Sequence, residues 1–328
     1  MQSWPDVFAG FSKLKVLIIG DVMVDAYIWG VVERISPEAP VPIIQVTNRD
    51  NRLGGAANVA LNVLSLGATP ILCAISGEDD NGKLLDKLLA DKKLSREGIV
   101  RSTTRPTTVK ARVIASHQHV VRIDQESDQV ATAGEEKELL SRIEKLLPGC
   151  DVVVFEDYDK GVITPSLIAK TVQWAKEKDI PTVVDPKKRN FLHYKDVTLF
   201  KPNLKELREG LKIEVDPREM TSVKEAVRLL KDRLAVEGVM LTMSEHGVFI
   251  DHRAAQKLIP AHKREIADVS GAGDTVVSIA ALCVALGLTA EEIAFLSNLG
   301  GGLVCQHVGV VPIDRNELLE EANRESAG

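Results

Sequence analysis

The segment DVSGAGD (268–274) places two glycines and a carboxylate immediately before a long apolar stretch. Gly271 and Gly273 permit unusual backbone angles and let main-chain amides approach a ligand closely. If the stretch is a helix, the amides of Gly271, Ala272 and Gly273 lie at its N-terminus and form an anion site. Asp274 would sit among these amides with a low pKa, which suits a group that orients a hydroxyl during phosphoryl transfer. An N-capping aspartate after a glycine-rich turn is the structural alternative.

Two further segments could bind the reactants of such a transfer. LGGAANVALNVLSLG (53–67) reads as a helix that opens on two glycines, where a sugar could lie against the backbone and Asn58 could reach its hydroxyls. In KPNLKE (201–206), Asn203 and Glu206 share one face of a helix start at i, i+3. A neutral and an acidic oxygen side by side could hold a hydrated Mg²⁺ near phosphates. Helix packing for the first segment and helix capping for the second are the alternatives.

Paired cations suggest that the acceptor itself carries a phosphate. Lys110 and Arg112 alternate along one predicted strand, so both side chains face the same side. Lys187 and Lys188 follow the end of another strand, where open α/β sheets bind ligands. A pair of cations can hold a terminal phosphate. Solvated surface charges are the alternative interpretation.

Composition excludes several classes of protein. The chain of 328 residues carries 41 basic and 47 acidic side chains, a net charge of −6, and only 4% aromatic residues. Such a chain is a poor candidate for a non-specific nucleic-acid binder, which needs a basic surface. Its uncharged stretches are interrupted or shorter than the roughly 20 apolar residues of a bilayer span, and the N-terminus lacks the features of a secretory signal. We therefore expect a cytoplasmic protein with no nucleic-acid or membrane partner.

Two features of the sequence argue against other nucleotide-binding classes. GEDDNGK (77–83) formally fits a phosphate-cradling loop, but Leu84 replaces the required Ser or Thr, and three acidic residues would repel a triphosphate. We interpret it as an acidic turn before a helix. No G-x-G-x-x-G follows the first predicted strand, which weakens a dinucleotide-dependent oxidoreductase reading.

The elements that must position these groups alternate along the chain. Uniformly apolar strands separated by helices imply parallel β-α-β crossovers with both sheet faces covered. The predicted fold class is therefore α/β, a doubly wound, mainly parallel sheet flanked by helices. We expect strands at 15–21, 69–76, 151–156, 181–186, 197–203 and 239–244, and helices at 54–67, 134–148, 164–178, 222–235 and 275–287.

Two segments break this alternation. Residues 26–50 and 107–124 are hairpin-like and alternating, the second with a turn at Ser116-His117-Gln118. They predict a small separate β-sheet, which we interpret as a lid over a cleft; a decorative edge hairpin is the alternative. We find no linker, so residues 1–328 are expected to form a single domain with this lid.

The predicted lid strands carry apolar residues on one face, namely Ile43, Val46, Val113 and Ala115. Unpaired strand edges recruit partners. We therefore predict a homodimer in which the lids of two chains pack together.

The order of the motifs, GGAANVA early, NLKE in the middle and DVSGAGD late, resembles the ribokinase-like (PfkB-type) family of carbohydrate kinases over essentially the whole chain. The resemblance implies an ATP-dependent sugar kinase with a β lid that uses Mg²⁺. It makes Asp274 the catalytic base, with the anion hole at Gly271, Ala272 and Gly273. The ATP/Mg²⁺ site would comprise Asn203, Leu204, Lys205 and Glu206, with Glu206 acting on the metal through water. The substrate-binding set would be Asp25, Gly54, Gly55, Asn58, Lys110, Arg112, Asp157, Lys160 and Lys187.

Within that family, several stretches resemble the D-glycero-β-D-manno-heptose 7-phosphate kinases, among them RISPEAPVPI (34–43), EDYDKGVIT (156–164) and DPKKRNF (185–191). This resemblance implies phosphorylation of the anomeric hydroxyl of the heptose 7-phosphate on the route to ADP-heptose, a precursor of the lipopolysaccharide core. Bifunctional relatives carry a second, nucleotide-transferring domain with an HxGH signature. We find no such signature, and we expect a single activity that works with a separate nucleotidyltransferase.

Three other functions remain open at this point. The chain could phosphorylate another acceptor, such as fructose 6-phosphate, ribose or a nucleoside. It could be a non-catalytic nucleotide- or sugar-binding regulator on a kinase fold, although a regulator has no need of Gly271, Gly273, Asp274, Asn203 and Glu206 together. A dehydrogenase is the third possibility, and it lacks its glycine fingerprint.

Overall fold

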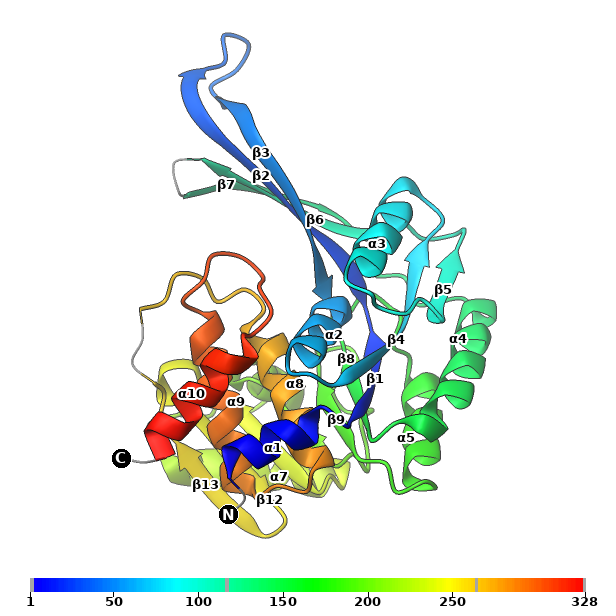
Figure 1. Cartoon of the computed structure of the whole chain (residues 1–328), viewed down its shortest axis with the longest axis vertical. Helices are drawn as coiled ribbons and strands as arrows, with labels where there is room; N and C mark the ends of the chain where they lie inside the picture. Colours follow the sequence, from blue (N-terminus) through cyan, green and yellow to red (C-terminus); the bar gives the residue numbers. More distant parts are fainter. Residues whose placement is uncertain (1–2, 116–117, 263–264, 327–328) are drawn as a thin grey trace.

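The fold is an α/β sheet with helices on both faces and a second, smaller sheet that projects away from it (Figure 1). The structure is a computed structural model that describes residues 3–115, 118–262 and 265–326. The large sheet has nine strands in the order β13-β12-β11-β10-β9-β8-β1-β4-β5. All pairings from β11 to β5 are parallel, and β12 and β13 add an antiparallel edge. The predicted fold class is confirmed.

The elements of the large sheet and its helices follow the predicted alternation closely. The strands are β1 Lys15–Gly20, β4 Thr69–Gly77, β5 Gly98–Ser102, β8 Val152–Glu156, β9 Thr182–Asp185, β10 Leu199–Phe200, β11 Gly238–Thr242, β12 Val248–His252 and β13 Ala255–Ile259. The helices are α1 Trp4–Phe11, α2 Ala56–Ser65, α3 Asp80–Asp91, α4 Ala133–Leu146, α5 Pro165–Lys176, α6 Leu204–Leu211, α7 Met220–Leu234, α8 Ala272–Ala285, α9 Ala290–Val304 and α10 Arg315–Ser326.

Uniformly apolar strands bury both of their faces. In β1, Val16 and Ile18 point into a core shared with α1, α2, α8 and α9, whereas Leu17 and Ile19 point into a core shared with α4, α5 and α7. Alternate residues of a strand face opposite sides of a sheet, so a strand covered by helices on both sides must be apolar throughout. This double cover leaves the strand ends as the place where polar groups can gather.

The small sheet has four strands in the order β3-β2-β6-β7. They are β2 Val22–Ile35, β3 Pro42–Gly55, β6 Thr108–Ala115 and β7 Gln118–Gln125. The two hairpin-like segments predicted from the sequence are thus the two halves of one sheet, joined by the parallel pair β2–β6. Of the predicted turn at 116–118, Ser116 and His117 lie outside the described residues.

Several predicted boundaries are wrong: the strand expected at 197–203 is only Leu199–Phe200, and the helix expected from Thr275 begins at Ala272. The helix expected from Gly54 begins at Ala56, because β3 continues through Gly54 and Gly55, which pair with Met23 and Val22 of β2. Gly55 has φ +59° and ends the strand. The two glycines therefore close the ladder of the small sheet, and Gly55 is at the same time the N-cap of α2.

The apolar face expected on the small sheet is only partly exposed. Val113 and Ala115 are buried, at 7% and 4% exposure, because β6 is an inner strand flanked by β2 and β7. Val46 on the edge strand β3 and Ile123 on the edge strand β7 are 43% and 57% exposed. The uncovered apolar surface thus lies toward the two edges of the sheet.

The acidic turn before α3 forms as predicted. Asp79 is the N-cap of α3 and accepts a hydrogen bond from the amide of Gly82 at 2.7 Å. It also accepts one from the Thr107 hydroxyl at 2.7 Å, which ties the turn to the base of the small sheet. In the described part of the chain, every helix is too short or too polar to cross a lipid bilayer.

Candidate active site

The polar groups gather at the carboxyl ends of the central strands. Glu156 is the last residue of β8, Asp185 is the last residue of β9, and Asn203 follows β10. Asp274 lies in the first turn of α8, which packs against β8 and β9. Ligands of open α/β sheets bind at this edge. The fold thus brings DVSGAGD and the strand-end carboxylates to one place.

Asp274 is almost fully buried, at 3% exposure, and both of its carboxylate oxygens accept hydrogen bonds. Nδ2 of Asn58 in α2 donates to Oδ2 at 2.6 Å, and the hydroxyl of Tyr158 donates to Oδ1 at 2.7 Å. Gly271, the N-cap of α8, has φ +81°, and a Cβ there would lie 3.0 Å from Nδ2 of Asn58. A glycine at this position therefore lets the Asn58 amide reach Asp274.

The expected low pKa of Asp274 is wrong. Burial raises the pKa of Asp274 to about 6, against the hydrogen bonds from Asn58 and Tyr158, and the nearby carboxylates of Asp185 and Asp25 raise it further. The N-terminus of one helix does not outweigh the loss of hydration around a buried carboxylate. At neutral pH Asp274 is therefore ionised but is a stronger base than an exposed aspartate.

Two lysines face the strand-end carboxylates. Lys201, only 3% exposed, forms a 2.8 Å ion pair with Oδ2 of Asp185. Lys187 lies 3.7 Å from Oδ1 of Asp185 and binds Oε1 of Glu206. Burial and the carboxylates of Asp185 and Asp274 raise the pKa of Glu156 well above its usual value. The result is a mixed cluster of acids and lysines beside Asp274.

Asn203 and Glu206 form a helix cap. The backbone amide of Asn203 donates to Oε2 of Glu206 at 2.8 Å, and the side-chain oxygen Oδ1 of Asn203 accepts from the backbone amide of Glu206 at 2.9 Å. The capping alternative is therefore what the structure contains at the start of α6. Oε1 of Glu206 points to Lys187 and so to the cluster around Asp185. Of the other two positions, Leu204 packs against the core, and Lys205 is exposed beside Glu209.

The small sheet supplies the second wall of the site. Its register pairs Asp25 with Lys110 and Tyr27 with Arg112, and Arg112 binds Oδ1 of Asp25. A Cβ on Gly54 would lie 2.1 Å from Oδ2 of Asp25, so this close approach requires a glycine. Lys110 and Arg112 lie on the same side of β6, as their spacing predicts.

Lys110 and Lys160 converge on one carboxylate. Nζ of Lys160 lies 2.7 Å from Oε1 of Glu126, and Nζ of Lys110 lies 4.0 Å from Oε2. Lys110 also lies over the ring of Tyr158, with Nζ 5.9 Å from the ring centre, and Lys187 lies 5.6 Å from the same centre. The ring of Tyr158 therefore lies close to a cation of the small sheet and to a cation of the strand-end cluster.

Asp157 makes its contacts within the core. Its Oδ2 accepts hydrogen bonds from the Tyr194 hydroxyl at 2.8 Å and from Nδ2 of Asn190 at 3.0 Å. Oδ1 accepts from the amide of Asp159. The carboxylate thus fixes the turn after β8, and the hydrogen bonds to Asp274 come from Asn58 and Tyr158.

Comparison with known proteins identifies the group to which this site belongs. The family described as "pfkB family carbohydrate kinase" matches residues 13–315. The chain belongs to the pfkB family of carbohydrate kinases. The resemblance inferred from GGAANVA, NLKE and DVSGAGD is confirmed, and the protein is a phosphotransferase that acts on a sugar hydroxyl.

Relatives of this pfkB-family chain are longer proteins. It is 39% identical over 310 residues to the "Bifunctional protein HldE" of Syntrophotalea carbinolica, and it covers 63% of that protein and 94% of itself. It is 37% identical to the HldE of Pelobacter propionicus, covering 97% of this chain and 65% of the relative. The chain thus spans somewhat less than two thirds of the length of these relatives.

Solved structures share the fold at low sequence identity. Phosphofructokinase-2 from Escherichia coli in complex with potassium has a TM-score of 0.80 at 17% identity, covering 95% of this chain and 99% of that one. Ribokinase of Arabidopsis thaliana complexed with ribose and ATP has a TM-score of 0.72 at 17% identity, covering 94% and 99%. At 17% sequence identity, the similarity to these structures shows a shared fold and nothing more.

Sequence reasoning missed four residues of the candidate site: Tyr158, Glu156, Asp185 and Lys201. Each lies at or just after the carboxyl end of β8, β9 or β10, so the strand-end rule that singled out Lys187 was a signal for them as well. The contacts of Tyr158 with Asp274 and of Lys201 with Asp185 form only in the folded chain, and sequence spacing does not reveal them.

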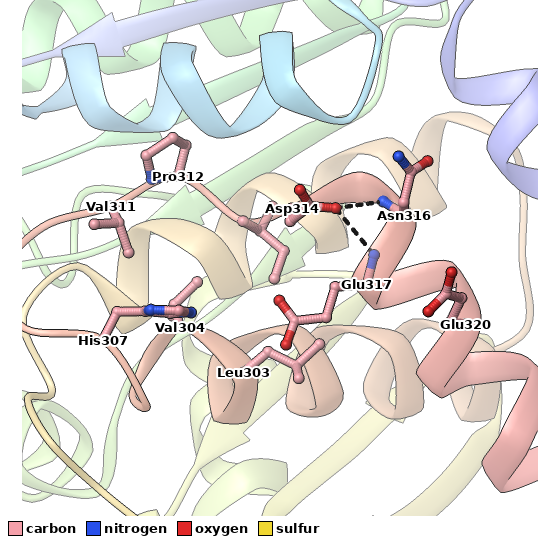
Figure 2. A pocket seen from close by; sticks show the side chains of 10 residues that line it. Leu303, Val304, His307, Val311, Pro312, Asp314, Asn316, Glu317 and Glu320 are labelled. Atoms are coloured by element: carbon pink, nitrogen blue, oxygen red, sulfur yellow. Dashed lines mark hydrogen bonds between the residues drawn. The ribbon is translucent and has the colours of Figure 1, made fainter.

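A separate hollow of about 460 Å³ lies between α9 and α10 (Figure 2). Asp314 at its edge caps α10 by accepting hydrogen bonds from the amides of Asn316 and Glu317 at 2.8 and 3.0 Å. Glu317 and Glu320 add carboxylates to the lining, with His307 on the opposite side. An acidic lining disfavours phosphate groups, and this hollow contains none of the predicted site residues.

Proposed function

We propose that this pfkB-family kinase transfers the γ-phosphoryl group of ATP to the anomeric hydroxyl of D-glycero-β-D-manno-heptose 7-phosphate. The products are ADP and the 1,7-bisphosphate, which a nucleotidyltransferase would then consume. The proposal rests on the stretches of the sequence that resemble heptose kinases and on the similarity to proteins named bifunctional protein HldE. It rests also on Lys110 and Lys160, which are discussed below.

Asp274 is the proposed base. In phosphoryl transfer the attacking hydroxyl keeps its proton until late, so the base must above all hold the hydroxyl in line with the phosphorus. Asn58 and Tyr158 fix the Asp274 carboxylate from two sides. A carboxylate has about four lone-pair sites, so two remain for the sugar hydroxyl. Its pKa of about 6 keeps it ionised at neutral pH and able to accept the proton.

The N-terminus of α8 would stabilise the charge on the transferred group. Helix N-termini present amides and a partial positive charge to anions. The Ala272 amide already donates to the carbonyl of Val269 at 3.3 Å, so the amides of Gly271 and Gly273 are the better candidates for the anion hole. Both precede Asp274 in the same turn, which would bring the phosphoryl group next to the base.

The residues near Glu206 fit a magnesium ion. Mg²⁺ prefers oxygen ligands and usually binds through one or two carboxylates, water and substrate phosphates. Glu206 offers a carboxylate 11% exposed, and Oδ1 of Asp185 is buried without a hydrogen-bond partner among the described residues. When bound, Mg²⁺ neutralises the charge that develops on the phosphates. Lys187 would hold Glu206 in place for this role.

The main support for a phosphorylated acceptor is that Lys110 and Lys160 both lie beside the carboxylate of Glu126. Two cations share one carboxylate, so the group is net positive. Lys110 lies over the ring of Tyr158, whose hydroxyl binds the proposed base. A sugar held at Asp274 could therefore extend a terminal phosphate toward these cations, with Arg112 nearby on the same strand.

An acceptor panel with ATP tests the proposal. We expect turnover with heptose 7-phosphate to exceed that with fructose 6-phosphate, ribose and nucleosides by at least tenfold in kcat/KM. Lys110→Met should raise the KM for heptose 7-phosphate about 10- to 100-fold, the value of a charge-assisted hydrogen bond to phosphate. Lys83→Met, which removes a lysine 80% exposed on α3, is the matched control and should leave the KM unchanged. Preference for another acceptor would reject the heptose assignment.

We also propose that two chains dimerise through the small sheet. Its edge strands β3 and β7 expose apolar side chains, including Val46 at 43%, Val121 at 48% and Ile123 at 57%. Exposed apolar edge strands favour pairing with another chain. A second copy of the same sheet offers a complementary apolar surface.

A further inference from the structure

Tyr158 connects the proposed base to both walls of the site. Its hydroxyl donates to Oδ1 of Asp274 at 2.7 Å. Its ring lies under Lys110 of the small sheet and Lys187 of the strand-end cluster, with ring-centre distances of 5.9 and 5.6 Å. Cations over an aromatic face are attracted to the ring quadrupole. The ring thus lies near a cation from each wall while its hydroxyl reaches Asp274.

The backbone of Tyr158 is anchored as well. Its amide donates to Oδ2 of Asp21 at 2.9 Å, and the amides of Lys160 and Val162 donate to the same buried carboxylate at 3.1 and 3.2 Å. Three amides on one carboxylate fix the path of the turn after β8. The hydroxyl of Tyr158 therefore has little freedom to leave Asp274.

The direction of the hydrogen bond is fixed by the acidity of the two groups. Burial and the neighbouring carboxylates of Asp274 and Glu156 raise the pKa of the Tyr158 hydroxyl well above its usual value. Tyr158 therefore stays protonated at neutral pH and acts as a donor. A donor to a carboxylate favours its ionised form.

We propose that Tyr158 is a positioning residue for the phosphoryl transfer, which fixes Oδ1 of Asp274 and holds the carboxylate ionised while its remaining lone pairs receive the sugar hydroxyl. The inference rests on the proposed role of Asp274 as the base. It assigns to Tyr158 no contact with the substrate and no proton transfer of its own.

The groups that face Asp274 make this donor important. Three carboxylates act on Asp274 from three different strands, namely Asp25 in β2, Glu156 in β8 and Asp185 in β9. Each favours the protonated form, as does burial. Asn58 and Tyr158 are the hydrogen-bond donors that oppose them. Without Tyr158, Asp274 should remain protonated to a higher pH.

A spectroscopic test needs no variant of Tyr158. The chain has three tyrosines, so labelling the full chain with 3-fluorotyrosine gives three ¹⁹F NMR signals, which Tyr27→Phe and Tyr194→Phe assign by elimination. We expect the Tyr158 signal to titrate with a midpoint near pH 6, the pKa of Asp274, and to lose this titration in Asp274→Asn. A Tyr158 signal that is flat between pH 5 and 7.5 overturns the inference. So does a titration that persists in Asp274→Asn, which would assign it to Asp21, whose pKa burial raises to about 6 and which accepts the Tyr158 amide.

The pH profile of Tyr158→Phe is the kinetic test. We expect the acidic limb of kcat/KM to move upward by about one unit, since a lost hydrogen bond to a carboxylate shifts its protonation equilibrium by about tenfold. A one-unit shift should lower kcat/KM about tenfold at pH 5 and about threefold at pH 6.5, and kcat/KM should return close to the wild-type value at pH 8.5. The KM for ATP should stay within about twofold of the wild type. A loss of equal size at every pH would mean that Tyr158 only supports the fold, and would overturn the proposal.

Tyr194→Phe is the matched control. Tyr194 is a buried tyrosine whose hydroxyl donates to a carboxylate at 2.8 Å, but that carboxylate belongs to Asp157. The Tyr194→Phe variant should leave the acidic limb of the kcat/KM profile at the same pH as in the wild type. The two proposals fail separately: an enzyme inactive with every sugar rejects the proposed function, while the ¹⁹F titration still decides whether Tyr158 controls Asp274.

Discussion

Nδ2 of Asn58 lies 2.6 Å from Oδ2 of Asp274, although 216 positions separate the two residues in the chain. The contact joins the first turn of α2, just after the small sheet returns to the core, to the first turn of α8. α2 and α8 pack against each other along this line. The sugar-side motif and the DVSGAGD motif are therefore two halves of one hydrogen-bonded unit around the proposed base.

Asp274→Asn should keep the fold and ATP binding but lower kcat by roughly two to four orders of magnitude, the contribution of a positioned acid–base group. The side chain keeps its shape, loses its ability to accept the proton, and keeps only one of the two oxygens that accept hydrogen bonds from Asn58 and Tyr158. In the wild type, kcat/KM should fall below about pH 6 as Asp274 becomes protonated. Steady-state kinetics from pH 5 to 9 and calorimetry of ATP binding measure both effects. Turnover close to that of the wild type would remove Asp274 from the mechanism.

The same substitution should stabilise the protein at neutral pH. The folded-state pKa of Asp274, about 6, lies above its ordinary value of 3.8, so the folded state binds the proton more tightly than the unfolded chain does. Stability from this group is therefore present below about pH 4 and is lost as the pH rises through 6, by about 3 kcal/mol for two units. Urea unfolding should show Asp274→Asn more stable than the wild type at pH 7.5, with the gap narrowing at pH 4.5. A gap independent of pH would contradict this explanation.

Gly54→Ala should impair sugar binding. The added methyl group would lie 2.1 Å from Oδ2 of Asp25, which must then move together with its partner Arg112. We expect the KM for the sugar to rise at least tenfold with little change in the KM for ATP. Gly134→Ala is the control, because a Cβ there meets nothing within 4 Å and the residue lies in the first turn of α4. Equal kinetics for the two variants would show that Asp25 does not bind the sugar.

Lys201→Met should destabilise the fold by about 3–5 kcal/mol, because it leaves the carboxylate of Asp185 buried without its 2.8 Å partner. Lys176→Met is the matched control, since Lys176 is 73% exposed and lies 3.8 Å from Asp196 at the surface. An exposed pair of this kind contributes at most about 1 kcal/mol. Urea unfolding compares the two variants. If both cost the same, the Asp185–Lys201 pair is not the central support of the strand-end cluster.

The proposed dimer can be tested in solution. Light scattering at micromolar concentration should give the mass of two chains, and Ile123→Glu on the edge strand β7 should shift the protein to a monomer by placing a charge on the apolar surface. Ile266→Glu, at an apolar side chain 68% exposed outside the small sheet, is the control and should leave the dimer intact. A monomeric wild type would reject the dimer.

The sequence predicts those features that depend on local pattern. Apolar runs predict six strands of the large sheet and their parallel crossovers, but not β5, β12 and β13 or the order of the strands. Alternation places Lys110 and Arg112 on one side of β6, and the glycines of DVSGAGD predict the start of α8. The capping of α6 by Asn203 was also visible, because a cap needs only residues three apart.

Features that depend on packing could not be predicted. The pKa of Asp274 depends on how deeply Asp274 is buried and on the carboxylates of Asp185 and Asp25 from two strands, and local spacing carries neither. Tyr158 gives no sequence signal for its contact with Asp274, 116 positions away. The boundary error at Gly54 has the same origin, because the long pairing of β2 with β3 extends the strand past the point where helix propensity would begin α2.

The identity of the product tests the central proposal most directly. The purified 328-residue chain should be given ATP, Mg²⁺ and heptose 7-phosphate, and the products examined by mass spectrometry and ³¹P NMR. We predict ADP and a sugar bisphosphate whose new phosphoryl group is at the anomeric carbon, with the unphosphorylated heptose used far less efficiently. An ADP-sugar would contradict the single activity, and equal kcat/KM for the unphosphorylated heptose, or ADP without a sugar bisphosphate, would contradict the assignment itself.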